Sequence, residues 1–361
     1  MTVLPYSSST AEISIEALRF NYQIIKKSLS AGTTIAAVVK ANAYGHGAVE
    51  VTQTLIDEGV NFLCVARVEE AIQLRNAGIQ KDILVFSPPT NVTRSAYLSY
   101  NLIATFSDFA QFEKAEKGMR VHINIDTGMG RLGFLYYDLA KLEEVLEQFA
   151  SKVKVEGIYT HFSDAESPEK DLTREQILRF NEVLSYFEVK NWLVHQANSA
   201  SCAAITSAHR NMVRPGIALY GYDEGFAFAE PLRPVLTWKS EIVEVRKLPA
   251  NWPISYGATY HTNEEGNVGV VAVGYGDGLN RALSGRIKFA DSQTGKLYEQ
   301  IGRLTMDHCM IWLGKEALAI GASIDLVNGK AESLKAWATK LNTIPCELIC
   351  SINSRVRRTH N

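Results

Sequence analysis

Residues 35–47 read Ile-Ala-Ala-Val-Val-Lys-Ala-Asn-Ala-Tyr-Gly-His-Gly, an apolar run that passes into a polar turn. The five apolar residues predict a strand buried on both faces, because they do not alternate with polar ones. Lys40 follows the strand, where low dielectric favours a neutral, nucleophilic amine. The turn offers backbone N–H groups and the phenol of Tyr44 to a phosphate. A single lysine at a strand end is more often a solvated surface residue, so the rest of the chain must decide.

Similar apolar runs recur through the first two thirds of the chain. Together with the first they cover residues 35–41, 62–68, 82–88, 102–108, 121–127, 153–162, 192–198 and 212–214. Helical patterns precede or separate them, for example at residues 15–29, 139–149 and 177–187, and Ser14 is placed to cap the first helix. Eight such units predict an α/β fold, a (β/α)8 or TIM barrel, with a doubly wound open sheet as the alternative.

The pattern changes after residues 231–234, which contain two prolines and predict a boundary. Strand-like segments then cover residues 237–248, 267–275, 286–290, 300–313 and 322–327, and only 331–341 has a clear helical pattern. We therefore predict a barrel domain over residues 1–234 and a mainly β C-terminal domain over residues 235–361. Residues 9–14 have strand character, so residues 1–14 are expected to pack with the C-terminal domain.

Composition excludes several classes of protein. The chain of 361 residues has a formal net charge of -2 and no basic bias, which argues against nucleic acid or an anionic membrane as a partner. Five cysteines form no Cys-x-x-Cys pair, and the N-terminus lacks the pattern of a secretion signal. No stretch approaches the length of a membrane span. We expect a cytoplasmic protein.

Reactive side chains follow several predicted strands. They are Lys40, Arg131, His161, His195, Asn198, Ser199 and Arg214. In a barrel the carboxyl ends of the strands form one rim, so these groups are expected to gather there as an active site. Each one alone is more often structural than catalytic.

The rim suggests a particular cofactor. Ser199, Gly216 and Ile217 follow strands seven and eight, where barrels commonly bind phosphate, and Tyr44 could add its hydroxyl. A lysine beside a phosphate pocket favours pyridoxal 5'-phosphate over NAD, because no Gly-x-Gly-x-x-Gly follows a strand. A metal hydrolase is the competing class. His46, His161 and His195 are its candidate ligands, but no His-x-His pair or suitable carboxylate completes a site, so no metal is expected.

Residues 38–47 resemble the pyridoxal-phosphate attachment motif of alanine racemases. Further segments resemble motifs of this family in the same order, at residues 126–133, 159–162, 197–199, 213–220, 255–260, 274–278 and 306–307. The resemblance covers essentially the whole chain. It implies an N-terminal barrel joined to a β-rich C-terminal domain, in a head-to-tail homodimer.

The resemblance also implies roles for individual residues. Lys40 would carry the cofactor and act as the base on one face of the substrate carbon, and Tyr256 of the partner subunit would be the base on the other face. The family positions that hold the phosphate correspond to Tyr44, Ser199, Gly216 and Ile217. Arg214 matches the residue that faces the pyridine nitrogen, and His161 matches a residue beside the cofactor ring. The positions near the phenolic oxygen and the substrate carboxylate correspond to Arg131 and Met306. As a phenolate, Tyr256 needs nearby positive charge, for which Arg131 and His161 are candidates.

Two positions depart from the family pattern. Asn124 stands where many members have a lysine, often carbamylated, and a bound anion such as chloride could replace that negative charge. Near the C-terminus, Ser354 replaces a tyrosine and Arg357 a proline, so no phosphate contact is expected from the tail.

Four functions follow from these observations. The first is an alanine racemase that supplies D-alanine for peptidoglycan, and the second is a racemase of broader specificity, acting on serine or lysine. A non-catalytic pyridoxal-phosphate carrier is disfavoured by the complete C-terminal domain with Tyr256. A related barrel decarboxylase is disfavoured by Arg214.

Overall fold

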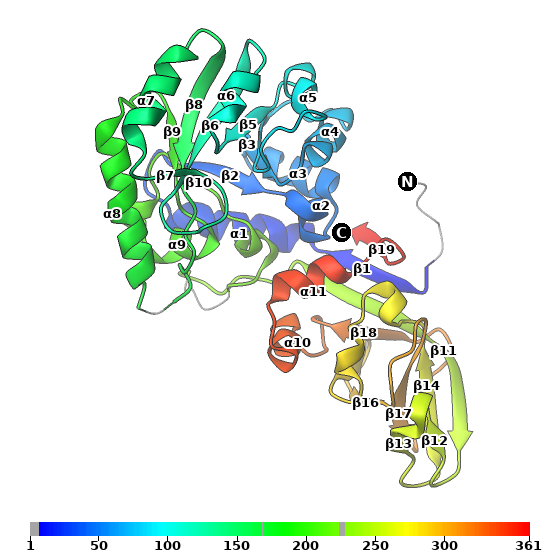
Figure 1. Cartoon of the computed structure of the whole chain (residues 1–361). Coiled ribbons are helices and arrows are strands. Elements are labelled where there is room, and N and C mark those ends of the chain that lie inside the picture. The colour runs from blue at the N-terminus through cyan, green and yellow to red at the C-terminus, as the bar shows by residue number, and fades with distance from the viewer. Residues whose placement is uncertain (1–6, 168, 224–227) are drawn as a thin grey trace. The chain divides into compact units, whose positions relative to one another are not determined.

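A computed structural model describes residues 7–167, 169–223 and 228–361. The chain divides into two compact units. The first, called the barrel unit here, comprises Leu18–Ala43 and Ala48–Arg233. The second, the β unit, comprises Met1–Ala17, Tyr44–Gly47 and Pro234–Asn361. Figure 1 shows the helices and strands of both.

The barrel unit is a closed ring of eight parallel strands. They are β2 (Thr34–Val38), β3 (Phe62–Val65), β4 (Asp82–Val85), β5 (Ile103–Phe106), β6 (Met119–Asp126), β8 (Val153–Tyr159), β9 (Leu193–His195) and β10 (Met212–Val213). Strand β10 pairs with β2, and β5 pairs with β6, so the ring has no open edge. The predicted (β/α)8 barrel is confirmed, and the open sheet is excluded. A two-residue strand, β7 (Phe134–Leu135), pairs with the end of β6.

Helices surround the ring, as Figure 1 shows. They are α1 (Ile15–Ser28), α3 (Ala48–Asp57), α4 (Val68–Asn76), α5 (Arg94–Ser99), α6 (Ala110–Lys114), α7 (Leu139–Gln148), α8 (Asp171–Tyr186) and α9 (Ser199–Ala204), with short 3-10 turns at η1 (Thr206–Ala208) and η2 (Ile217–Tyr220). Ser14 caps α1, since its hydroxyl accepts a hydrogen bond from the Ala17 N–H at 3.1 Å. The strands are buried on both faces because helices cover the outside and side chains fill the inside.

The β unit is built on one eight-stranded sheet. Its strands are β1 (Ser9–Ile13), β11 (Leu236–Leu248), β14 (Gly266–Val271), β15 (Lys288–Asp291), β16 (Leu297–Ile301), β17 (Cys309–Gly314), β18 (Ser323–Val327) and β19 (Arg357–His360). The long strand β11 pairs antiparallel with β1, β14 and β18. A hairpin of β12 (Pro253–Ile254) and β13 (Tyr260–His261), helices α10 (Leu334–Leu341) and α11 (Pro345–Ser351), and 3-10 turns η3 (Tyr256–Ala258), η4 (Tyr275–Asp277) and η5 (Arg281–Leu283) complete it. This region is mainly β, as predicted.

Three details differ from the sequence predictions. The strand predicted over residues 300–313 is wrong, because β16 ends at Ile301, Gly302 turns the chain with φ 66°, and β17 begins only at Cys309. Helix α11 was not predicted, since seven residues are too few to show a helical period. Strand β2 ends at Val38, two residues before Lys40.

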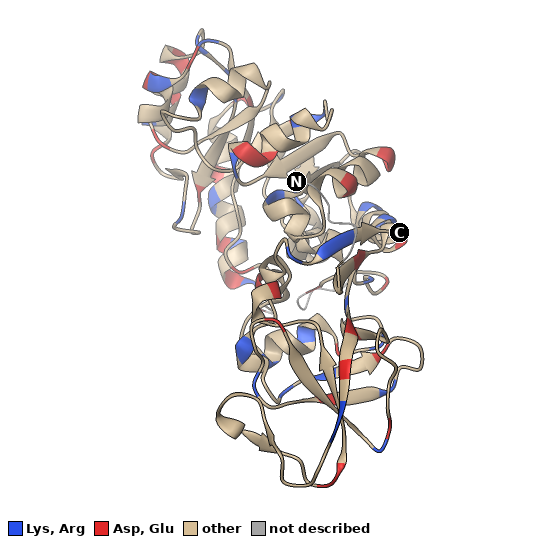
Figure 2. Cartoon of the chain, turned by 90° about the vertical axis from the view of Figure 1, so that its right-hand side faces the viewer, with Lys and Arg blue, Asp and Glu red and all other residues tan. Residues whose placement is uncertain are grey.

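Acidic and basic side chains are interspersed along both units, with no extended stretch of one sign in the view of Figure 2. This distribution agrees with the formal net charge of -2. Among the described helices, none combines the length and apolar character needed to cross a membrane.

Candidate active site

A cavity of about 260 Å³ opens at the carboxyl ends of the barrel strands. Lys40, Arg131 and His161 line it together, although they come from three separate loops. Phe86, Asn124, Met129 and Tyr159 are among the other lining residues. The structure therefore brings together three of the predicted site residues in an enclosed, partly apolar pocket.

Arg214 lies below the rim with its guanidinium almost fully buried, at 3% exposure. Its Nη1 donates to His195 Nδ1 at 2.6 Å, and its Nη2 donates to the Thr160 carbonyl oxygen at 2.8 Å. Nη2 also lies 3.2 Å from His161 Nδ1 and 3.4 Å from the Gln196 carbonyl oxygen. These bonds fix the orientation of the guanidinium, which can only donate hydrogen bonds.

A chain of histidines continues from Arg214 into the barrel interior. Because arginine can only donate, His195 Nδ1 must accept, and His195 Nε2 carries the proton that it donates to His122 Nδ1 at 2.9 Å. Burial lowers the pKa of His122 to about 3 and lowers the pKa of His195 well below its usual value. The Tyr159 ring stacks on His195 with centroids 4.7 Å apart. A neutral His195, itself held by a neutral His122, therefore helps to fix the position of Arg214.

His161 is also neutral. Its pKa is lowered to about 3, first by burial and then by the positive charges of Arg214, Arg131 and Lys40. A neutral His161 is poorly suited to supply positive charge to a phenolate, which favours Arg131 of the two predicted candidates. Both nitrogens of His195 are engaged by Arg214 and His122, so His195 could bind a metal only by breaking those bonds.

The predicted phosphate residues of the barrel unit lie together after β9 and β10. The backbone N–H groups of Gly216 and Ala218 both donate to Ser199 Oγ, at 2.9 and 3.3 Å. Ile217 opens the 3-10 turn η2 between them. Ser199 itself begins α9, whose N-cap Asn198 accepts from the Ser201 N–H at 3.1 Å. The two N–H groups therefore fix the Ser199 hydroxyl, whose own proton can be donated to an anion.

Lys40 opens a turn, α2 (Lys40–Tyr44), that is wound in the left-handed sense. Ala41, Asn42 and Ala43 have φ between 52° and 55°, and Tyr44 has φ 52°. L-residues in a left-handed helix cost roughly 1–2 kcal/mol each, because Cβ crowds the backbone. The predicted phosphate residue Tyr44 belongs to the β unit.

The loop that carries Arg131 is folded around a carboxylate. Asp126 Oδ1 accepts from the N–H groups of Gly128 and Met129 at 2.8 and 2.9 Å, and Oδ2 accepts from Gly130 N–H at 3.0 Å. Asn124, beside it on β6, donates its amide to the Leu132 carbonyl at 3.0 Å. The loop is thus anchored at both ends without a charged group at position 124.

The β unit has a hollow of about 920 Å³ at one end of its sheet. Tyr256 and Met306, the two predicted site residues of this unit, both line it, with Trp252 and Tyr275. Tyr256 is 67% exposed and Met306 is 52% exposed. Large side chains gathered on an open surface usually mark a contact with another molecule.

Tyr256 is carried on a strained backbone. Ser255 before it has φ 61° and ψ -174°, and Ala258 after it has φ 45°. The Ser255 hydroxyl donates to the Arg303 carbonyl oxygen at 2.6 Å. Residues other than glycine rarely adopt such backbone angles, and those that do cluster at functional sites, where the backbone directs a side chain.

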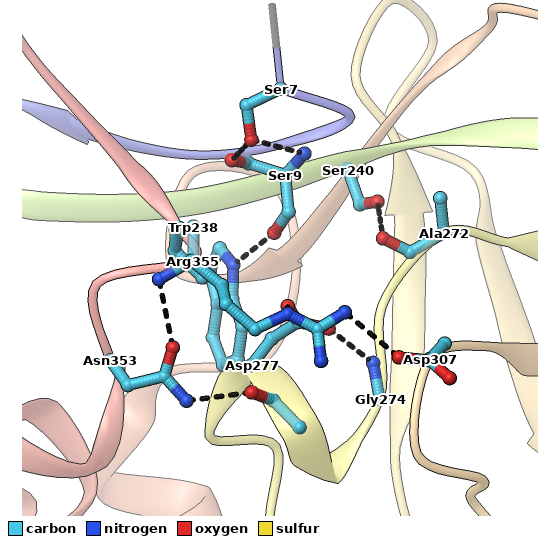
Figure 3. A network of polar contacts seen from close by, with 12 residues as sticks. Ser7, Ser9, Trp238, Ser240, Ala272, Gly274, Asp277, Asp307, Asn353 and Arg355 are labelled. Atoms are coloured by element: carbon cyan, nitrogen blue, oxygen red, sulfur yellow. Dashed lines mark hydrogen bonds and ion pairs between the residues drawn. The ribbon is translucent and has the colours of Figure 1, made fainter. Parts of the chain in front are cut away.

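A polar network that includes Asp277, Asp307 and Arg355, shown in Figure 3, links the 3-10 turn η4 to the segment after Met306. Arg355 forms ion pairs with Asp277 at 3.2 Å and with Asp307 at 2.8 Å. The Gly276 N–H donates to the Met306 carbonyl at 2.8 Å. A Cβ at position 276 would lie 2.8 Å from that same oxygen, so only glycine fits there without a shift.

Two family models match the chain over nearly its whole length. One describes the alanine racemase N-terminal domain and matches residues 13–224, and the other describes the alanine racemase C-terminal domain and matches residues 235–360. The chain belongs to the alanine racemase family. Members of this family are isomerases that depend on pyridoxal phosphate.

Individual relatives agree with this assignment. An alanine racemase of Carboxydothermus hydrogenoformans is 37% identical over 97% of this chain and 98% of its own. The crystal structure of an alanine racemase from E. faecalis is 35% identical, with a TM-score of 0.94 and complete coverage of both chains. An alanine racemase from Bartonella henselae, solved with covalently bound pyridoxal phosphate, is 25% identical with a TM-score of 0.89, over 99% of this chain and 100% of the other.

The barrel unit fits the cofactor on which the family depends. Lys40 lines the cavity, and the buried guanidinium of Arg214 is a fixed hydrogen-bond donor of the kind that suits a pyridine nitrogen. The Ser199 hydroxyl accepts from the N–H groups of Gly216 and Ala218 and can donate its own proton to a phosphate. These groups are the chemical partners that the aldehyde, ring nitrogen and phosphate of pyridoxal phosphate require.

Sequence reasoning missed several residues that hold these groups in place. His122 was not considered, although it precedes Asn124 by two residues on the same strand and therefore faces the barrel interior with it. Ser255 and Asp126 were considered only as parts of motifs, and Arg355 was not considered. A carboxylate just before a glycine-rich turn is a signal that could have pointed to Asp126.

Proposed function

We propose that this protein is a pyridoxal-phosphate-dependent racemase that interconverts L-alanine and D-alanine with two bases. Lys40 acts on one face of the substrate, and Tyr256 of the partner subunit acts on the other. Residues 1–234 form the cofactor-binding domain, except that strand β1 (Ser9–Ile13) pairs with β11 in the β unit, and residues 235–361 supply Tyr256 and Met306. The observation that carries the proposal is the gathering of Lys40, Arg131 and His161 around one cavity, with Arg214 fixed beside His161.

Pyridoxal phosphate, when bound, acidifies the α-proton of an amino acid joined to it. The protein must then remove that proton on one side and return a proton on the other. Lys40 Nζ, in the cavity of the barrel unit, takes or returns the proton on its own side. An amine can serve in both directions because it accepts a proton as the free base and returns one as the ammonium.

The hydroxyl of Tyr256 serves the opposite side. A phenol has an ordinary pKa of about 10, so its anion needs a positive neighbour to take part near pH 7. Arg131 lines the cavity and can supply this positive charge, whereas the pKa of His161 is lowered to about 3 by burial. Two fixed bases on opposite faces let the enzyme act on both enantiomers without turning the substrate.

Arg214 limits other reactions. Guanidinium keeps its proton, so at the pyridine nitrogen it donates a hydrogen bond and leaves that nitrogen neutral. Its bonds to His195 and Thr160 hold it there. Transamination and decarboxylation need stronger electron withdrawal than a neutral ring provides, so we expect them to be slow.

The proposal requires a homodimer with shared active sites. Tyr256, Met306, Tyr275 and Trp252 are each more than 40% exposed around the hollow of the β unit. A second copy of the chain, with the rim of its barrel unit seated there, would bury them and deliver Tyr256 to a cavity containing Lys40. Arg131 and Met306 would then lie beside the substrate carboxylate.

Racemisation of purified protein tests the proposal. The assay follows the enantiomers of alanine, serine and lysine separately, and borohydride treatment followed by peptide mapping locates the bound cofactor. We expect rapid racemisation of alanine, slow turnover of serine and label on Lys40. Faster racemisation of serine or lysine than of alanine would favour the broader specificity that Asn124 leaves open, and an unlabelled Lys40 would contradict the proposal.

The biological role is a further part of the proposal. D-alanine made by this enzyme would supply cell-wall peptidoglycan, so cells without the gene should need D-alanine for growth. Growth without the supplement, in a strain that has no other such racemase, would contradict this role. The cytoplasmic location remains a prediction, which cell fractionation would test.

A further inference from the structure

The turn that follows Lys40 is held in its left-handed form by hydrogen bonds from neighbouring helices. The Ala41 N–H donates to Glu70 Oε1 at 2.5 Å. Asn42 Oδ1 accepts from the Ala48 N–H at the start of α3, at 2.8 Å. Within the turn, the Ala43 N–H donates to the Val39 carbonyl oxygen at 2.9 Å. An unfavourable backbone conformation persists only where its surroundings fix it, and these contacts do so.

Glu70 also caps a helix. Its second oxygen, Oε2, accepts from the N–H groups of Ala66 and Arg67, at 2.8 and 2.9 Å, just before the start of α4. One carboxylate therefore joins the N-terminus of α4 to the peptide group next to Lys40. The negative charge suits this place, since a helix N-terminus carries partial positive charge.

We propose that Glu70 is a positioning residue for Lys40. Its carboxylate ties the turn of residues 41–44 to α4 and so fixes the direction in which the Lys40 side chain leaves the backbone. The inference rests on the proposed function, because it assigns Glu70 to the reaction that Lys40 carries out. Glu70 itself is not expected to touch substrate or cofactor.

The carboxylate is necessary because both of its oxygens accept. Glutamine has nearly the same shape but replaces one acceptor with an NH₂ group. In Glu70→Gln the amide oxygen should remain where two N–H groups meet, at Ala66 and Arg67. The NH₂ would then face the Ala41 N–H and repel it. This substitution therefore breaks the tether and keeps the helix cap.

Hydrogen exchange in the full-length protein tests the tether directly. With residue-level resolution, the Ala41 amide of Glu70→Gln should exchange about 10- to 100-fold faster than in the wild type, since it loses a charge-assisted bond. Amides of residues 66–76 should exchange as before. Glu69→Gln is the matched control, because it makes the same chemical change at the neighbouring, exposed position of α4.

Steady-state kinetics provide a second measurement. A misdirected Lys40 should lower kcat for alanine at least about 10-fold in both directions, because small misplacements of a reacting group have large effects on rate. KM for alanine should change less than about twofold, since Glu70 contributes no substrate contact. The absorbance band of the lysine-bound cofactor should also weaken or shift in Glu70→Gln and stay unchanged in Glu69→Gln.

The outcomes distinguish a failure of the role proposed for Glu70 from a failure of the proposed racemase function. Wild-type exchange at Ala41 in Glu70→Gln, or equally faster exchange throughout α4, would overturn the role of Glu70. Faster exchange at Ala41 with unchanged kcat would overturn it as well, because the tether would then have no effect on Lys40. If wild-type protein carries no cofactor on Lys40 after borohydride treatment, the proposed function fails, whatever the exchange shows.

Discussion

Substitution of Ser255 tests whether Tyr256 is held on a strained backbone. Ser255 has φ 61° and ψ -174°, angles that crowd its Cβ, and such an outlier costs about 1–3 kcal/mol. Its hydroxyl donates to the Arg303 carbonyl at 2.6 Å, a bond that contributes about 0.5–1.5 kcal/mol. The native conformation therefore combines a large local cost with a smaller local gain.

Two variants separate these contributions. Ser255→Ala loses the hydrogen bond and keeps the strain, so it should lower the free energy of unfolding by about 1 kcal/mol. Ser255→Gly loses the same bond but relieves the strain. Glycine loses more backbone entropy on folding, which costs about 0.5–1 kcal/mol. The relieved strain outweighs this cost, so the glycine variant should be more stable than the alanine variant by about 0.5–2 kcal/mol.

Urea unfolding followed by tryptophan fluorescence measures the difference. Ser284 is the matched control, because it has an ordinary φ of -51°. At Ser284 the order should reverse, with alanine more stable than glycine. The reasoning is refuted if Ser255→Ala is at least as stable as Ser255→Gly while the control behaves as expected.

Three further predictions follow from the site. Tyr256→Phe should slow exchange of the α-proton of L-alanine with solvent deuterium more than that of D-alanine, and equal slowing would remove the assignment of one base to each face. The pKa of His122 and of His161 is lowered to about 3 in the folded protein, whereas each titrates near pH ~6.5 in the unfolded chain. Between these pH values the unfolded state binds more protons, so the free energy of unfolding should fall as the pH drops through that window. A urea midpoint that stays constant from pH 7 to 5 would contradict the neutral histidines. Gly157→Ala would place a Cβ 2.7 Å from the His122 ring and from the Leu193 carbonyl oxygen, and should destabilise the protein by about 1–3 kcal/mol, a loss that thermal unfolding would detect.

The barrel could be predicted because its signal is local. Each strand is a short apolar run, and the eight runs predicted from the sequence correspond to the eight strands of the ring. The β unit was harder, since its strands end at turns such as Gly302 whose conformation depends on neighbours. Ile254 and Ser255 approach Gly302 so closely that a Cβ there would lie 2.9 Å from the Ile254 side chain.

The left-handed turn after Lys40 could not be predicted from the sequence. Alanine at positions 41 and 43 favours right-handed helix, and no glycine lies within the four residues of the turn. The conformation depends on Glu70, which lies 29 residues further along the chain. The histidine chain below Arg214 is equally non-local, because His122 and His195 meet only after the barrel closes.

The most direct test of the central claim uses dimers that contain two different variants. Lys40→Ala and Tyr256→Phe chains, carrying different tags, are produced together, and the mixed dimer is purified through both tags. If each site takes Lys40 from one chain and Tyr256 from the other, one of its two sites is intact, so it should show about half the wild-type activity per dimer. A mixed dimer no more active than the average of the two parent variants would contradict the shared site.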